Sequence, residues 1–210
     1  MKAAWLPHYN DNDYKGEWKA LPLRTINGST GSHFAGGEVA DYKDTELMEE
    51  CPGIKEIVDG FRCNKLSVRL LNLRPGSLIK EHRDRGLFFE DGLVRIHVPI
   101  QTSDQVEFFL DNEEMKLQSG SCWYMNFDLP HRLANKGETD RVHLVFDCEV
   151  NDWVKDLFAS CSEEQVKRIE VKDKFSIKDK QQIIAALRRM DTETSREMAD
   201  RMEHELAIQE

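Results

Sequence analysis

A histidine and an aspartate stand two positions apart in the segment "SLIKEHRDRG", at His82 and Asp84. In an extended segment, residues i and i+2 project to the same face, so both side chains can reach one point. They would supply two ligands of a triad of two histidines and one carboxylate, a donor set that suits Fe(II) and leaves coordination positions open. A surface ion pair with the neighbouring arginines, or chance, also explains so short a motif.

A third ligand is expected on a later strand. His131 lies in "FDLPHRLANKGETDR", and Arg141 opens the strand "RVHLVFD" after a loop of turn-forming residues between 135 and 140. This loop lets the chain double back and brings a guanidinium beside the metal-binding end of the neighbouring strand. Because arginine can bind a carboxylate through two parallel hydrogen bonds, the set predicts a site for a metal-chelating carboxylic acid.

Three segments, "RPGSLIKEHRD", "VRIHVPI" and "GSCWYMNFDLPHRLANKGETDRVHLVFDCEV", follow one another in an order that resembles a known family. The family is the aspartyl/asparaginyl β-hydroxylases, 2-oxoglutarate-dependent iron oxygenases that include bacterial proline cis-hydroxylases. The resemblance covers about residues 64–153. It implies a jelly-roll, cupin-like double-stranded β-helix and the use of Fe(II), 2-oxoglutarate and O₂, with ascorbate as a supporting reductant in vitro.

The resemblance also implies roles for individual residues. The catalytic iron ligands would be His82, Asp84 and His131, and the cosubstrate would be bound by Arg141, His97 and Arg95. In this reading Arg141 holds the far carboxylate of 2-oxoglutarate, and Arg95 lies near both cosubstrate and substrate. Considered without the resemblance, His97 reads more naturally as a hydrogen-bonded core imidazole.

Substrate contacts are predicted at Arg69, Arg95 and Trp123. Arg69 interrupts the apolar strand "LSVRLLNL" and suits a substrate carboxylate, although a surface arginine with a buried stem explains it equally well. Trp123 and Tyr124 can line the pocket, with core packing expected for at least one of them.

Other histidines receive no motif-based role. His143 shares a strand face with Arg141, but no motif assigns it a function. His8, His33 and His204 are expected to be surface or loop residues.

The elements that would position these residues are mostly strands. Residues 61–150 contain several short apolar, β-branched runs separated by turn signals, which favours a sandwich or barrel. In "GLVRIHVPI", the alternation places Val94, Ile96, Val98 and Ile100 on one face and Arg95 and His97 on the other. The predicted fold is mainly β, with a double-stranded β-helix core, an N-terminal mixed region and C-terminal helices.

Two domains are expected, 1–155 for the barrel with its N-terminal flank and 156–210 for a helical extension. In the extension, Ile183, Leu187 and Met190 fall on one helical face, and Met198, Met202 and Leu206 on another. Such stripes predict packing on the barrel or on a second subunit, and therefore a possible homodimer through the C-terminal helices.

The amino-acid composition of the chain argues against some classes of binding partner. A formal net charge of −10 argues against a nucleic-acid partner, which normally requires a basic face. No stretch has the length and apolarity of a signal peptide or a membrane span, so no membrane partner is expected. Five cysteines without a secretion signal predict reduced thiols and a cytoplasmic location.

The function predicted is hydroxylation of an unactivated C–H bond in a free amino acid or small derivative, with release of succinate and CO₂. One alternative is hydroxylation of Asp, Asn or another residue in a peptide or protein. Another is a non-oxidative metal-binding cupin, either an isomerase or a small-acid binding module. The presence of Arg141 together with His97 distinguishes the hydroxylases from the non-oxidative cupin, because a simple metal cupin has no reason to keep these residues in this arrangement.

Overall fold

The computed structural model describes residues 5–31, 41–160 and 177–190, together with residues 196, 199, 200, 203 and 206. The chain separates into two compact units, 1–160 and 161–210. The predicted domain boundary at 155 and 156 falls within helix α3 (Asp152–Ala159) of the first unit.

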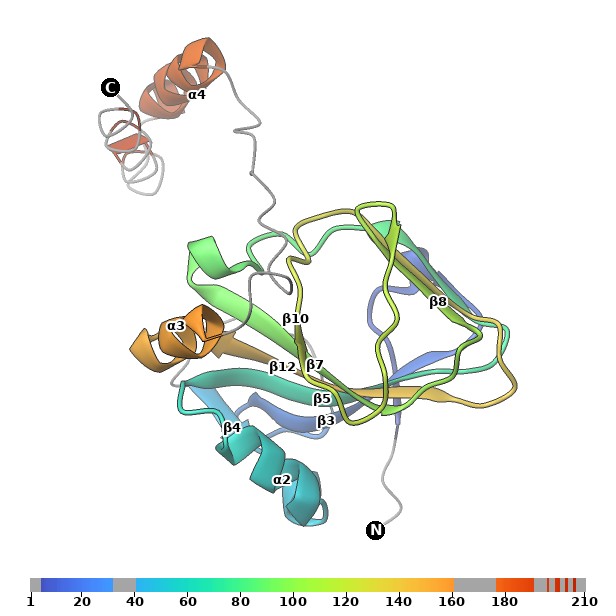
Figure 1. Cartoon of the computed structure of the whole chain (residues 1–210). Helices are drawn as coiled ribbons and strands as arrows, with labels where there is room; N and C mark the ends of the chain where they lie inside the picture. The colour runs from blue at the N-terminus through green and yellow to red at the C-terminus, as the bar shows by residue number, and fades with distance from the viewer. Residues whose placement is uncertain are drawn as a thin grey trace. The chain divides into compact units, whose positions relative to one another are not determined.

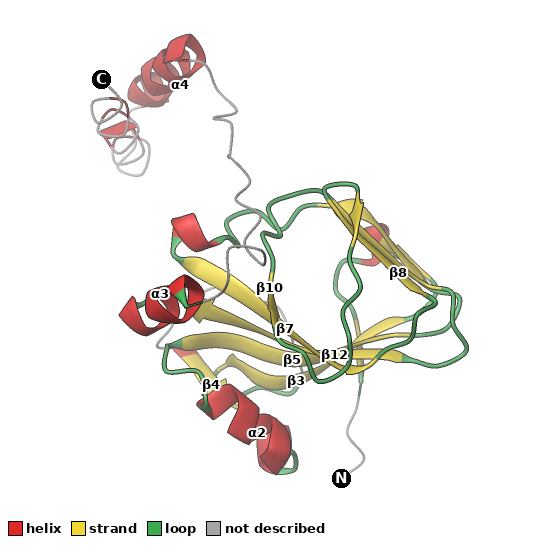
Figure 2. Cartoon of the chain, in the orientation of Figure 1, coloured by secondary structure: helices red, strands yellow, loops and turns green. Residues whose placement is uncertain are grey.

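Two antiparallel sheets form the first unit (Figures 1 and 2). The larger sheet contains, in spatial order, β1 (Leu6–Pro7), β3 (Trp18–Ile26), β5 (Lys65–Leu73), β12 (Arg141–Glu149), β7 (Leu93–Gln101) and β10 (Trp123–Tyr124), with β4 (Tyr42–Asp44) paired to β3. The smaller sheet contains β2 (Tyr14–Lys15), β6 (Leu78–His82), β11 (His131–Asn135), β8 (Val106–Leu110) and β9 (Glu113–Glu114). The prediction of a mainly β, two-sheet fold is confirmed.

The central strand of the larger sheet is β12, which pairs with β5 on one side and β7 on the other. Its outward residues Leu144, Phe146 and Cys148 are fully buried under helices. These helices are α1 (Glu46–Glu49), α2 (Pro52–Asp59) and α3, and Figure 1 shows α2 lying against this outer face. A 3₁₀ turn, η1 (Asp11–Asp13), precedes β2, and another, η3 (Phe89–Asp91), precedes β7.

The inward residues of β12 alternate with the apolar ones and are mostly polar. A second apolar cluster fills the space between the two sheets, and Val145 of β12 belongs to it. By the same alternation, Arg141, His143 and Asp147 face this interior, where all three are buried. The interior between the two sheets is therefore partly polar, whereas an ordinary protein core is apolar.

A tight turn at Asp111 and Asn112 connects two neighbouring strands of the smaller sheet. It joins β8 to β9, and both turn residues have positive φ, 49° and 65°, as a tight turn of this kind requires. Ile100, predicted on the apolar face of β7, is 45% exposed.

In the second unit, the described helix is α4 (Ile177–Met190). Arg188 pairs with Asp200 and Glu203 at 2.5 and 2.8 Å. Among the described side chains of α4, Ile184 is buried, whereas Ile183 and Leu187 of the predicted stripe are partly exposed. None of the described helices has the length and apolarity needed to cross a membrane.

Several sequence predictions lie outside the described residues. They are the C-terminal stripe at Met198 and Met202 and the positions of His33 and His204. The homodimer predicted through the C-terminal helices remains a prediction.

Candidate metal centre

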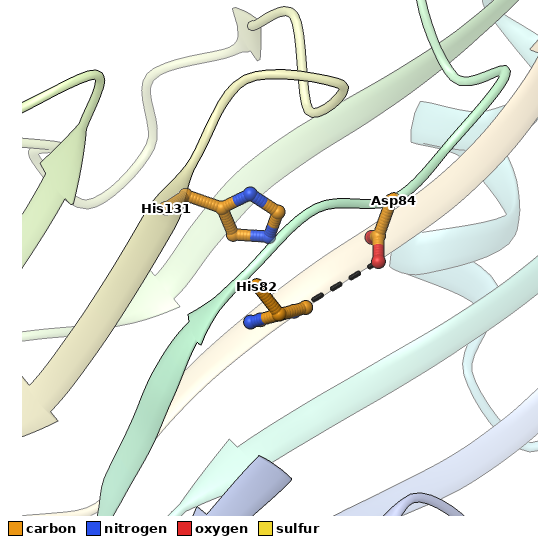
Figure 3. Close-up of side chains that lie close together, drawn as sticks. All are labelled: His82, Asp84 and His131. Carbon is orange, nitrogen blue, oxygen red and sulfur yellow. Dashed lines mark ion pairs between the residues drawn. The ribbon is translucent and has the colours of Figure 1, made fainter.

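His82, Asp84 and His131 come together at one end of the smaller sheet (Figure 3). His82 ends β6, and His131 begins β11 directly opposite it in the antiparallel register. The two imidazole ring centroids are 4.2 Å apart, and His82 Nε2 lies 3.8 Å from Asp84 Oδ1. One potential ligand atom from each residue lies within 4.8 Å of the others, so the three can reach a single metal ion.

Backbone carbonyls define which imidazole nitrogens face the ion. His82 Nδ1 lies 2.8 Å from the Lys80 carbonyl oxygen, and His131 Nδ1 lies 3.0 Å from the Leu129 carbonyl oxygen. A carbonyl only accepts, so each Nδ1 carries the proton and each Nε2 keeps a lone pair for a metal. Burial lowers the pKa of His131, which favours the neutral, metal-binding form.

Arg95 joins the metal centre to a buried carboxylate that the sequence analysis did not identify. Its guanidinium donates to Asp147 through Nε at 2.6 Å and Nη2 at 3.0 Å, and through Nη1 it donates to Asp84. Burial opposes ionisation of Asp147, but Arg95 and the nearby Arg69 outweigh it and hold the pKa of Asp147 well below its usual range. The signal was present in "RVHLVFD", where Asp147 shares the alternating face of Arg141.

Arg69 is part of the same cluster. Its Nη1 donates to Ser67 Oγ at 2.6 Å, Ser67 Oγ donates to Asp147 at 2.9 Å, and Arg69 Nη2 lies 3.6 Å from the same carboxylate. Arg69 is 5% exposed, so the alternative reading as a surface arginine is wrong. Two arginines therefore share one buried carboxylate beside the candidate ligands.

Arg141 and His97 are buried, and each has polar atoms without the partners that such groups normally require. Arg141 Nη2 lies 2.9 Å from His143 Nδ1, but no carboxylate among the described residues forms an ion pair with Arg141, and burial lowers its pKa. Neither ring nitrogen of His97 has a hydrogen-bond partner among the described residues, although the ring stacks on Phe127 at 4.7 Å. The alternative interpretation of His97 as a hydrogen-bonded core imidazole is therefore wrong. Arg141 and His97 both need a polar ligand.

One pocket unites these groups. Its lining includes all six predicted metal and cosubstrate residues together with Arg69, namely His82, Asp84, His131, Arg95, His97, Arg141 and Arg69. Apolar walls come from Leu71, Phe108 and Phe127. We call it the metal pocket.

Two predictions about the metal pocket need correction. His8, expected at the surface, is buried, lines the metal pocket and stacks on Trp18 with ring centroids 3.4 Å apart. Trp123, expected to line it, does not. Its indole N–H donates to Ser121 Oγ at 2.6 Å, and its ring packs against the interior apolar cluster.

The fold and the site together define an antiparallel two-sheet protein with a candidate centre of two histidines and one aspartate. The sequence signature of the family described as Aspartyl/Asparaginyl beta-hydroxylase matches residues 2–150, and the chain belongs to this family. A curated relative, L-proline cis-4-hydroxylase of Rhizobium meliloti (strain 1021), is 25% identical over 136 residues. That match covers 64% of this chain and 48% of the relative, so the chain spans about half the length of that protein.

Solved structures similar to this chain include a predicted oxalate decarboxylase from Thermotoga maritima, with 15% identity, coverage of 71% of this chain and 95% of the other, and a TM-score of 0.42. KdgF from Halomonas sp. has 11% identity, coverage of 70% and 94%, and a TM-score of 0.35. A cupin domain from Bordetella pertussis Tohama I has 15% identity, coverage of 43% and 88%, and a TM-score of 0.33.

Proposed function

We propose that this protein is an Fe(II)- and 2-oxoglutarate-dependent dioxygenase that hydroxylates an unactivated C–H bond of a free amino acid or small derivative, with O₂ consumed and succinate and CO₂ released. The observation that carries the proposal is one pocket that combines the cluster of His82, Asp84 and His131 with the buried Arg141, which has no carboxylate partner among the described residues. Family membership and the name of the curated relative support it.

The donor set fits a ferrous ion. Two imidazole Nε2 atoms and one carboxylate form the ligand type typical of non-haem Fe(II) oxygenases, whereas structural zinc sites usually have four protein ligands. When bound, the iron with 2-oxoglutarate and O₂ would supply the oxidising chemistry. The protein's own contribution is to keep each Nδ1 on a backbone carbonyl, which fixes the orientation of both rings.

The charged side chains of the metal pocket favour ligands that carry carboxylates. Three arginines, Arg69, Arg95 and Arg141, lie beside the carboxylates Asp84 and Asp147, and a further arginine and carboxylate, Arg132 and Asp13, also line the pocket. The four arginines exceed the three carboxylates by one positive charge, and a divalent ion would bring this surplus to three. A 2-oxo diacid neutralises two of these charges. Arg69 and Arg95 in addition favour a substrate that carries a carboxylate, as amino acids do.

Each residue then has a distinct task. Arg141 would bind the far carboxylate of 2-oxoglutarate, and His97 would offer a ring N–H to the same molecule. Arg95 and Arg69, fixed by Asp147, would orient the substrate carboxylate beside the metal. Phe108 and Phe127 exclude water and so strengthen these charge interactions.

The test measures succinate release from 2-oxoglutarate by the full chain with Fe(II), ascorbate and air. The twenty amino acids and their N-acyl forms are then screened by mass spectrometry for the gain of one oxygen atom. His82→Ala and His131→Ala serve as inactive controls. Absence of succinate under all these conditions would contradict the proposal and favour a non-oxidative cupin.

The substrate class is tested separately with short peptides that contain Asp, Asn or Pro. Hydroxylation of a free amino acid, but not of its C-terminal amide, is expected because the amide lacks the carboxylate that Arg95 and Arg69 would orient. Turnover of peptides in preference to every free amino acid would overturn the substrate assignment while leaving the cosubstrate chemistry intact.

A further inference from the structure

A second pocket lies on another side of Arg141. Its lining includes Ser103, Leu117, Arg141 and His143, and it shares Arg141 and Phe108 with the metal pocket. Three polar atoms of these lining residues are buried and have no hydrogen-bond partner in the described part of the chain: Ser103 Oγ, Arg141 Nε and His143 Nε2. Since buried polar groups are normally paired, these three atoms need polar partners from a molecule that enters the pocket.

The hydrogen bond between Arg141 and His143 fixes the state of the imidazole. Arg141 Nη2 lies 2.9 Å from His143 Nδ1, and because a guanidinium only donates, Nδ1 must accept. Burial and the charge of Arg141 lower the pKa of His143 well below its usual range, so the ring is neutral. Its proton is therefore on Nε2, and this N–H is the donor without a partner.

We propose that the far carboxylate of the 2-oxo acid is held by Arg141, His143 and Ser103 together rather than by Arg141 alone. This inference rests on the proposed function. Arg141 lines both pockets, so a 2-oxo acid bound at the metal centre with its far end at Arg141 would have that end beside the second pocket. His143 acts in two ways: Nδ1 orients the guanidinium, and Nε2–H donates to the carboxylate.

A carboxylate is the ligand that this set fits best. It accepts up to four hydrogen bonds, and Arg141 Nε, His143 Nε2 and Ser103 Oγ are all able to donate. A neutral ligand would leave the charge of Arg141 buried and uncompensated. His143 is 1% exposed, so its Nε2–H can find an acceptor only in a molecule that enters the second pocket.

The experiment compares two 2-oxo acids that differ only at the far end. 2-Oxoglutarate carries the carboxylate, and 2-oxovalerate carries a methyl group at that position. Binding of each to the full chain is measured by calorimetry without turnover, with Mn(II) in place of Fe(II). The variants are His143→Leu, which removes both nitrogens, His143→Gln, which keeps a donor near Nε2, and Ser103→Ala.

We expect His143→Leu and Ser103→Ala each to weaken 2-oxoglutarate binding about tenfold or more, the effect of removing a hydrogen bond to a charged group. Binding of 2-oxovalerate should change less than about twofold, because it makes no such bond. His143→Gln should recover part of the loss. Ser160→Ala, on the exposed end of α3, and Mn(II) affinity in every variant should match the wild type.

A second readout needs no ligand. Nitrogen-15 NMR of the ligand-free protein should show His143 with a protonated Nε2 and an unprotonated Nδ1. Equal weakening of both 2-oxo acids, unchanged 2-oxoglutarate binding in the His143 variants, or the opposite tautomer would each overturn the inference while leaving the proposed function in place. Failure of the wild type to bind 2-oxoglutarate would contradict both this inference and the proposed function. If His143→Leu does not fold, His143→Gln and Ser103→Ala decide the outcome.

Discussion

His131 lies directly opposite His82 across the pairing of β6 with β11, and this register brings the two imidazole rings to 4.2 Å. The two residues are far apart in sequence, so the candidate centre exists only when the smaller sheet has formed. A slip of the register by one residue would turn one of the two side chains to the opposite face.

Removal of a candidate ligand should abolish metal binding without unfolding the chain. Asp84→Ala is expected to weaken Mn(II) or Fe(II) binding by at least about a hundredfold, because loss of a ligand should cost more than loss of an outer partner. Calorimetric titration checks this. The matched control is Glu81→Ala, which removes an exposed carboxylate paired with Arg132 at 3.2 Å. Equal metal affinity in both variants would exclude Asp84 as a ligand.

Neutralisation of Asp147 should destabilise the folded protein more than neutralisation of any other carboxylate. Asp147→Asn leaves Arg69 and Arg95 without their shared buried partner, and we expect the free energy of unfolding to fall by about 3–5 kcal/mol. Urea denaturation at pH 7 measures it. Glu107→Gln, which removes a surface pair with Lys136 at 2.7 Å, should cost less than about 1 kcal/mol. Similar losses in the two variants would contradict the role of Asp147.

The pH dependence of stability follows from the same carboxylate. The folded state depresses the pKa of Asp147, so its contribution is fully present above the unfolded value, about pH 4, and is lost progressively as the pH falls below it. The wild type should therefore lose stability between about pH 4 and pH 2 more steeply than Asp147→Asn. Parallel curves of unfolding free energy against pH for the two proteins would refute this.

Arg141 should lower the stability of the ligand-free protein, because its charge is buried without a carboxylate partner. Arg141→Met is expected to raise the unfolding free energy by about 1 kcal/mol and to abolish stabilisation by 2-oxoglutarate with Mn(II). Thermal unfolding with and without these ligands measures both effects. Arg74→Met, at an exposed pair with Asp140, is the control that should change neither. A ligand-free Arg141→Met protein less stable than the wild type would contradict the argument.

The sequence by itself determined features that follow from local periodicity. Alternation in "GLVRIHVPI" separated Arg95 and His97 from Val94, Ile96 and Val98, and the structure places the two groups on opposite faces. The spacing of His82 and Asp84 likewise put both on one side of an extended segment. Pro52 at the first position of α2 and Gly60 directly after its last residue follow the positional preferences of these two residue types. These outcomes depend only on the two-residue repeat of a strand and on the backbone limits of proline and glycine.

Tertiary structure decided everything that depends on pairing between distant segments. Asp147 became the partner of Arg95 because β12 lies beside β7 in a register that places the two residues opposite each other. His8 entered the metal pocket because β1 pairs with β3, and no local pattern predicted that contact. Strand order and register are set by the total burial and hydrogen bonding of the whole sheet. A window of neighbouring residues therefore contains too little information to specify them.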